Sequence, residues 1–214
     1  MAFHAWTLDE ERDLYAKALA TAEQALGPRK LKDYAGHFWG ILETRPYMRA
    51  RAGLATAYLK LGDPNTAIGH FRAMLVLNPG DNQGIRYVLA GVLLCREDIA
   101  GLKALLADYP YEGSLYWLYT RALLAFREGG NKRRANALAR AAWSANAHVP
   151  GILAGTMPPV AIDPEYIVVG GPAEAMVYVN DYAPGWIATP GAIAWLTKIA
   201  AACAAKARPG RVLH

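Results

Sequence analysis

Residues 48–81, MRARAGLATAYLKLGDPNTAIGHFRAMLVLNPGD, most restrict what this chain can fold into. They read as two amphipathic helices joined by a tight turn. Leu54 and Tyr58 are four residues apart, which places them on one face of the first helix. Gly62 can adopt the left-handed conformation that ends a helix, and Pro64 cannot continue it. The segment therefore predicts a helical hairpin.

This 34-residue unit resembles a tetratricopeptide (TPR) repeat. The family places large apolar, small and aromatic residues at set positions of two helices, with a glycine at the turn and a terminal proline. The matching residues are Leu54, Ala55, Tyr58, Gly62, Ala67, Phe71, Met74 and Pro79. Arg51 departs from the pattern, because an aromatic is commonest there, and Met74 stands where alanine is usual. One unit cannot bury its own apolar face, so the resemblance implies neighbouring helical pairs.

A closer likeness covers about residues 37–90. This part of the chain is similar to a bacterial TPR-protein group and, more loosely, to the TPR-like part of the suppression-of-tumorigenicity-7 family. Neither likeness implies a known chemistry.

We expect an all-α fold, a short TPR-like solenoid of helical hairpins that forms a single domain over residues 1–214. In chain order the predicted parts are an N-terminal helix and aromatic plug at 7–47, the clear repeat at 48–81, degenerate repeats at 82–150, an ordered loop at 151–171 and a pair of C-terminal capping helices at 172–206. Such terminal helices would cover the apolar ends of the solenoid, so we expect a monomer.

Local signals set the boundaries of the flanking parts. Thr7 and Glu10 match a capping box at the start of a helix that Gly27-Pro28 would end. The cluster His37-Phe38-Trp39 would plug the space between that helix and the repeat. Prolines and glycines break the helical pattern at 151–171. The loop is too apolar for a free linker, and a short strand at 166–169 is the less favoured reading.

Composition indicates a globular chain, because 54% of its residues are hydrophobic and 19% are charged. The net charge of +5 allows an acidic partner but is below that of most dedicated nucleic-acid binders. Cys95 and Cys203 lie in apolar helical stretches and predict buried free thiols, which suit a reducing compartment. The N-terminal residues lack the apolar core of a signal peptide, and no apolar stretch reaches membrane-spanning length. We expect a cytoplasmic protein.

The sequence contains no pattern that declares an active site. Its five histidines show no four-residue spacing and no cysteine neighbours, so we expect no metal site. No glycine-rich phosphate loop follows a strand, and no Gly-x-Ser-x-Gly turn is present. We therefore expect a non-enzymatic protein that needs no cofactor.

The candidate binding site follows from the TPR resemblance. In a TPR-like stack the first helix of each pair lines a concave face, and the residues at those positions here are Arg49, Thr56, Lys60, Asn82, Gln83, Arg86, Tyr87, Tyr116 and Tyr119. Arginine and tyrosine are enriched at binding hot spots, and cations can hold carboxylates. Some family members clamp a C-terminal carboxylate with lysine and asparagine. Ala52, Thr56 and Gln83 depart from that set, so no such clamp is implied. The alternative is an ordinary solvated, charged face.

The favoured function is therefore a protein–protein interaction module that binds a peptide or an acidic protein segment, with no membrane partner. One alternative is a small-molecule or enzymatic pocket between the repeats and the 151–171 loop, near Glu165 and Tyr166. Another is weak nucleic-acid binding, which rests only on the charge of +5.

Overall fold

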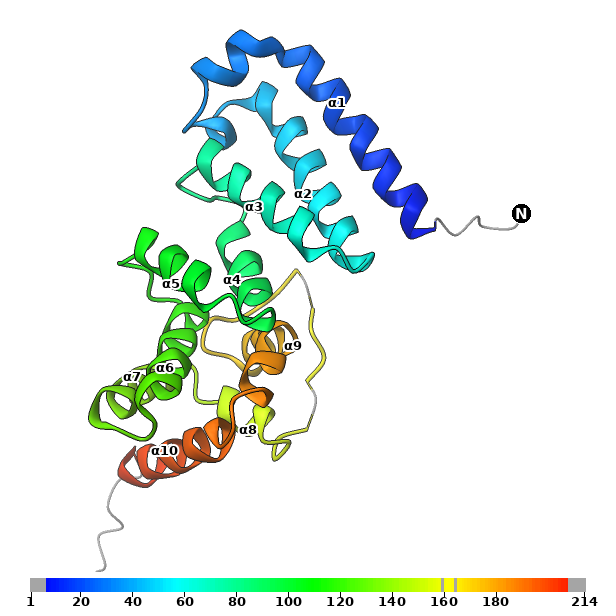
Figure 1. Ribbon diagram of the computed structural model, residues 1–214. Helices are drawn as coiled ribbons and strands as arrows, with labels where there is room; N and C mark the ends of the chain where they lie inside the picture. Colours follow the sequence, from blue (N-terminus) through cyan, green and yellow to red (C-terminus); the bar gives the residue numbers. More distant parts are fainter. Residues whose placement is uncertain (1–6, 159, 164, 208–214) are drawn as a thin grey trace, which may run out of the picture. The chain divides into compact units, whose positions relative to one another are not determined.

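The computed structural model describes residues 7–158, 160–163 and 165–207 (Figure 1). These residues form ten α-helices and two short 3-10 helices, with no strand among them. The expectation of an all-α fold is confirmed. The contacts divide the chain into two compact units, Met1–Val92 and Leu93–His214, which are described one at a time. The prediction of a single domain is not tested by this division and stays a prediction.

The first unit contains α1 (Leu8–Asp33), two 3-10 helices (Phe38–Gly40 and Leu42–Thr44), α2 (Arg45–Lys60), α3 (Pro64–Leu77) and most of α4 (Ile85–Cys95). Helix α2 packs against α1 on one side and α3 on the other (Figure 1). The α2–α3 pair is the hairpin that residues 48–81 predict. Its turn has Gly62 at φ 80°, and Asp63 caps α3 by accepting a hydrogen bond from the Thr66 backbone N–H at 3.1 Å.

Helix α1 begins as the sequence predicts but ends later. The Thr7–Glu10 capping box forms, with the Thr7 backbone N–H 2.8 Å from Glu10 Oε2. The predicted end at Gly27-Pro28 is wrong, because the helix is only interrupted there and continues to Asp33. Gly27 adopts φ 67°, which a glycine tolerates, and Pro28 is acceptable in the first turn of the helix that resumes after it.

Helices α1 and α2 approach closely where Gly53 faces Tyr15. A Cβ added to Gly53 would lie 2.2 Å from the Tyr15 ring, so the ring occupies the space that a side chain would need. The aromatic plug is smaller than predicted, because Phe38 is buried and contacts Tyr47 edge to face, whereas His37 is exposed.

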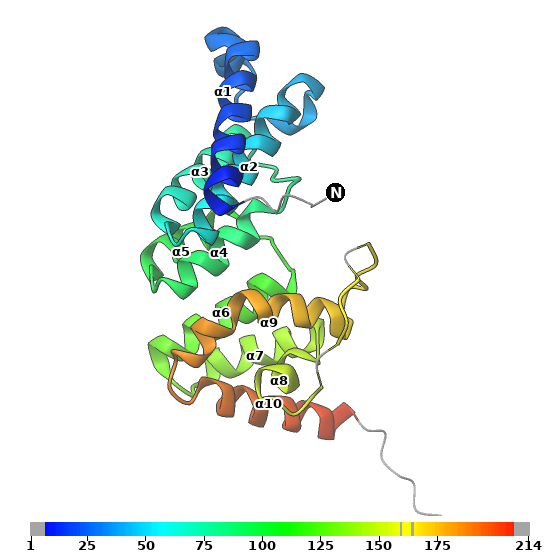
Figure 2. The same ribbon diagram turned by 90° about the vertical axis from the view of Figure 1, so that its right-hand side faces the viewer.

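The second unit contains α5 (Ile99–Asp108), α6 (Leu115–Gly129), α7 (Arg133–Ala145), the short α8 (Val149–Leu153), α9 (Pro172–Ile187) and α10 (Ala192–Ala207). Helix α6 packs against α7 and α9, and α10 packs against α7, α8 and α9 (Figure 2). The predicted loop at 151–171 thus begins with the end of α8, and residues 166–169 form no strand. Pro159 and Pro164 of that loop lie outside the described residues.

Large aromatic side chains fill the core of the second unit. Trp186 is fully buried, and its Nε1–H donates to Tyr178 Oη at 2.8 Å. The Tyr178 and Tyr182 rings stack at 4.6 Å. Arg127, near the end of α6, donates to the Gly185 carbonyl oxygen at 2.9 Å and so ties α6 to the end of α9. The Arg127 contact joins residues that are 58 positions apart in the sequence.

The cysteine and membrane predictions have separate outcomes. Cys95 and Cys203 are both free thiols, as expected, but Cys95 is exposed and Cys203 half-buried, so the prediction that both are buried is wrong. Among the residues described, no helix combines the length and the apolar character that crossing a membrane requires.

Candidate functional site

Three of the predicted groove residues, Arg49, Thr56 and Lys60, are exposed along α2. The Arg49 guanidinium lies over the Trp39 ring, 5.8 Å from its centroid. Lys60 is paired with Glu11 of α1, with 2.7 Å between Nζ and Oε1. This stripe remains accessible to a partner, but α1 already engages its C-terminal end.

Two of the predicted groove residues, Arg86 and Tyr87, belong to a hydrogen-bonded cluster at the start of α4. Asp81 is buried and caps α4, accepting hydrogen bonds from the backbone N–H groups of Ile85 and Arg86 at 2.8 Å each. Burial raises the pKa of Asp81, although these bonds and the Arg86 guanidinium act in the opposite direction. Arg86 Nη1 lies 3.1 Å from Asp81 Oδ2, and Arg86 Nη2 donates to Tyr87 Oη at 2.7 Å.

Arg86 therefore holds the first turn of α4 together, and charge reversal there would disturb the fold as well as any binding. Of the other two predicted residues at this helix start, Asn82 is exposed and Gln83 is half-buried.

The two predicted tyrosines of α6 differ from each other. Tyr119 is fully buried, and its hydroxyl donates to the Asn146 carbonyl oxygen at 2.6 Å. Burial raises the pKa of Tyr119 far above its ordinary value. Placing Tyr119 on a binding face is thus wrong, because α9 packs over this side of α6 and encloses the ring. Tyr116 is half-buried and contacts the rings of Tyr178 and Tyr182.

The alternative site near Glu165 and Tyr166 is a surface feature. Both residues are exposed, and Tyr166 retains 75% of its accessible area. Such exposed side chains do not by themselves enclose a small molecule.

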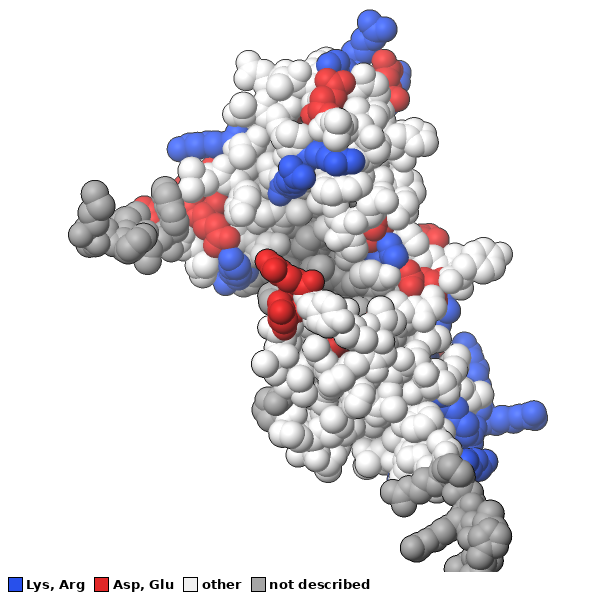
Figure 3. Space-filling view, turned by 180° about the vertical axis from the view of Figure 1, so that it is seen from behind, with Lys and Arg blue, Asp and Glu red and all other residues white. Residues whose placement is uncertain are grey.

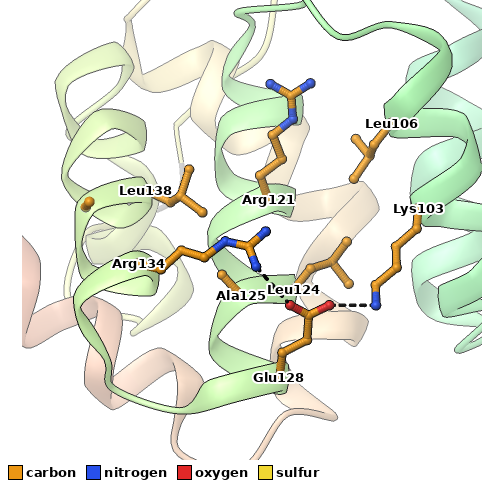
Figure 4. Close-up of a pocket in the computed structure, with 9 residues that line it drawn as sticks. Lys103, Leu106, Arg121, Leu124, Ala125, Glu128, Arg134 and Leu138 are labelled. Carbon is orange, nitrogen blue, oxygen red and sulfur yellow. Dashed lines mark hydrogen bonds and ion pairs between the residues drawn. The ribbon is translucent and has the colours of Figure 1, made fainter.

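A different hollow, of about 520 Å³, lies between α5, α6 and α7 (Figure 4). We call it the α5–α6–α7 groove. Its lining consists of Lys103 and Leu106 from α5, Arg121, Leu124, Ala125 and Glu128 from α6, and Arg134, Ala137 and Leu138 from α7. It lies entirely within the second unit.

The groove combines an apolar floor with charged ends. Leu106, Leu124 and Leu138 surround its middle, as Figure 4 shows. At one end the Glu128 carboxylate lies 2.6 Å from Lys103 Nζ and 3.4 Å from Arg134 Nη1. The hydrogen bond from Lys103 lowers the pKa of Glu128. The carboxylate of α6 therefore bridges the cations of α5 and α7.

Arg121 marks the other end of the groove. Its Nη2 donates to the carbonyl oxygens of Tyr109 and Pro110, at 3.3 and 3.2 Å. These carbonyls belong to the connection between α5 and α6, so the fold orients this guanidinium. Three cations and one carboxylate leave the groove with a net positive charge, and further basic side chains of α7 are exposed nearby (Figure 3).

Sequence reasoning missed this groove, although a signal for it exists. Arg121, Leu124 and Glu128 follow one another at three- and four-residue spacing, so they share a face of α6. Arg134 and Leu138 have the same four-residue spacing on α7. The resemblance directed attention to the first helix of each pair, whereas this groove uses two second helices as well.

The described residues contain no group of three or more side chains suited to hold a metal ion. Comparison with protein-family models gives no match, and comparison with curated proteins and with solved structures likewise gives no significant match. The arrangement of the α5–α6–α7 groove is therefore the main guide to function.

Proposed function

We propose that this protein is a non-enzymatic, TPR-like interaction module, and that it binds an acidic, partly apolar peptide segment in the α5–α6–α7 groove. The observation that carries the proposal is the apolar floor with cations at both ends. The helical hairpins α2–α3 and α6–α7 support the TPR-like part, since each has the two-helix form that the repeat pattern predicts.

The apolar floor would fix where the apolar side chains of a peptide lie, and most of its own gain in burial would come from Leu138. Leu106 and Leu124 are already largely covered, and Leu138 is half-buried, so apolar side chains of a peptide would complete the burial of all three. An entirely apolar ligand would leave the charged ends without matching groups. A segment with leucine-like side chains in its middle and carboxylates at its ends fits both features.

The cations would give orientation and selectivity rather than large affinity. Exposed ion pairs contribute about 0–1 kcal/mol each. The Lys103 side chain is about half exposed, and the Arg134 side chain is mostly exposed. Both already share Glu128, so a ligand carboxylate would join or replace an existing pair. Such an exchange of carboxylates costs little free energy. The cations select against basic ligands, because a lysine near Arg121 or Arg134 would be repelled.

The proposal is tested by fluorescence anisotropy with a labelled peptide of leucine and glutamate, beside the same peptide with lysine in place of glutamate. We expect the acidic peptide to bind and the basic one not to bind. Arg134→Glu should weaken the acidic peptide by about tenfold, whereas Arg133→Glu, a neighbouring exposed arginine outside the lining, should change its affinity by less than about twofold. Equal binding of both peptides, or equal effects of both variants, would reject the groove as the site.

Weak nucleic-acid binding remains the second hypothesis, favoured by the exposed Lys132, Arg133, Arg134 and Arg140 of α7. A labelled single-stranded oligonucleotide in the same assay separates the two. Under this hypothesis Arg133→Glu and Arg134→Glu would weaken oligonucleotide binding equally, because phosphate contacts add roughly alike.

A further inference from the structure

Residues 165–169 present an apolar run to solvent, and we call them the exposed segment. Tyr166, Ile167, Val168 and Val169 keep 75%, 40%, 53% and 84% of their accessible area. Four consecutive exposed apolar residues are unfavourable in water unless a partner covers them. Among the described residues of the second unit nothing covers the exposed segment, so a partner for it is sought outside this unit.

The exposed segment is fixed to helices on its C-terminal side. At its start the Glu165 backbone N–H donates to Asp163 Oδ1 at 3.0 Å, which forms a local turn within the same loop. Just after it, the Gly170 backbone N–H donates to Glu174 Oε2 at 2.7 Å, and Asn146 Nδ2 donates to the Gly171 carbonyl oxygen at 2.9 Å. Because the C-terminal side is fixed to the end of α7 and the start of α9, presenting these side chains to a partner costs less ordering than a free tail would.

The exposed segment matches the apolar floor of the α5–α6–α7 groove and the cations at one of its ends. The apolar run follows the carboxylates of Asp163 and Glu165, both exposed. The groove offers a leucine floor next to Arg121, Lys103 and Arg134. We propose that the occupant of the groove is the exposed segment of a second copy of this chain. This inference rests on the proposed function, because it names the partner of the same groove.

The contact would be head to tail. The exposed segment ends at the C-terminal end of α7, where Asn146 Nδ2 donates to the Gly171 carbonyl oxygen, whereas the groove uses Arg134 and Leu138 from the first half of that helix. Leu138 lies about 12 Å along the helix from Asn146, so the occupant of the groove is placed more readily on another copy. Each copy then offers one exposed segment and one groove, and repeating the contact adds copies at both ends.

Self-association should be weak. A five-residue segment in one groove buries less than the roughly 1,200 Å² of a standard interface. We expect monomers at about 5 µM and larger species toward about 500 µM, which corresponds to a dissociation constant in the upper micromolar range. Under this inference, the expectation of a monomer would apply to dilute protein.

Sedimentation velocity over this concentration range tests the inference. Wild type should sediment faster as its concentration rises, and less so when NaCl is raised from about 50 to about 500 mM, because exposed charges are then screened. A groove variant, Lys103→Glu with Arg134→Glu, and a segment variant, Ile167→Ser with Val169→Ser, should each stay monomeric. The matched controls Arg133→Glu and Val76→Ser, also exposed, should associate like wild type.

Mixing the two defective variants is the decisive step. The groove variant keeps its exposed segment and the segment variant keeps its groove, so together they should form a one-to-one complex that grows no further. Wild type that stays monomeric at about 500 µM, or a mixture that does not associate, would overturn the inference.

A peptide of residues 161–171 separates this inference from the proposed function. If the leucine–glutamate peptide binds the groove while this peptide does not and wild type stays monomeric, the function stands and self-recognition fails. If neither peptide binds, both proposals fail.

Discussion

The two units reach stable helical packing by different means. In the first, the helix caps join neighbours in the sequence, such as Asp63 with Thr66 and Asp81 with Arg86, although Lys60 of α2 also pairs with Glu11 of α1. In the second, side-chain hydrogen bonds join distant residues, such as Arg127 with Gly185 and Trp195 Nε1–H with Asn136 Oδ1, 58 and 59 positions apart. The helix ends of the first unit can accordingly be predicted from local patterns, whereas the core of the second unit forms only once its helices pack together.

The interiors differ as well. Between α1 and α2 of the first unit, the absence of a side chain at Gly53 leaves room for the Tyr15 ring. The second unit buries Trp186 and Tyr178 and satisfies their polar atoms by a mutual hydrogen bond. Large buried aromatic side chains contribute more free energy per residue than small buried side chains. They also require hydrogen-bond partners for their polar atoms. We expect the second unit to be more sensitive to single truncations.

Removal of Trp186 should have the largest effect. Trp186→Ala would leave a cavity in the second unit and lower the free energy of unfolding by about 3–5 kcal/mol. Ile187→Ala is the matched control, because Ile187 is adjacent but 71% exposed, and it should change stability little. Urea unfolding followed by circular dichroism measures both. Equal effects of the two variants would break the comparison between the units.

The Arg127 contact tests whether long-range hydrogen bonds stabilise the second unit. Arg127→Met keeps much of the side-chain volume but leaves the carbonyl oxygen of Gly185 and the hydroxyl of Thr189 without this donor. Hydrogen bonds to charged groups contribute about 1.5–3 kcal/mol, so we expect a loss in that range. Amide exchange should rise first in α9. Arg133→Met, which removes an exposed arginine, should leave exchange unchanged.

A pair of glycines tests the close packing of the first unit. Gly53→Ala should destabilise it by about 1–3 kcal/mol, because the new Cβ would lie 2.2 Å from the Tyr15 ring. Gly69→Ala in α3 meets nothing within 4 Å and should instead stabilise by about 0.5–1 kcal/mol. Thermal unfolding of both variants gives the signs. A stabilising Gly53→Ala would show that the Tyr15 ring moves aside without loss.

The smallest effect is expected at the Asp63 cap. Hydrogen bonds from the Thr66 hydroxyl and backbone N–H lower the pKa of Asp63 in the folded state. A lowered pKa stabilises the fold above the unfolded pKa, near 3.8, and this contribution is lost as the pH falls through the folded pKa. Asp63→Ala should therefore melt slightly below wild type at neutral pH, and the difference should vanish in strong acid. A difference that persists there would show that the ionised carboxylate is not the source.

The helical elements of the first unit were largely predictable because their signals are local. The Thr7–Glu10 box and the Gly62–Pro64 turn require only residues a few positions apart. The error at Gly27 has the same origin. A glycine followed by proline is compatible with both a helix end and a kink, and only packing beyond that point selects between them.

The sequence by itself determined the all-α class, the α2–α3 hairpin and most helix starts, because hydrophobic spacing and capping act within a few residues. Tertiary structure alone decided which faces are covered. It buried Tyr119 beneath α9 and brought Lys103 of α5 within 2.6 Å of Glu128 of α6. A helix face carries no mark of its partner, so the candidate groove emerged only when three helices had packed.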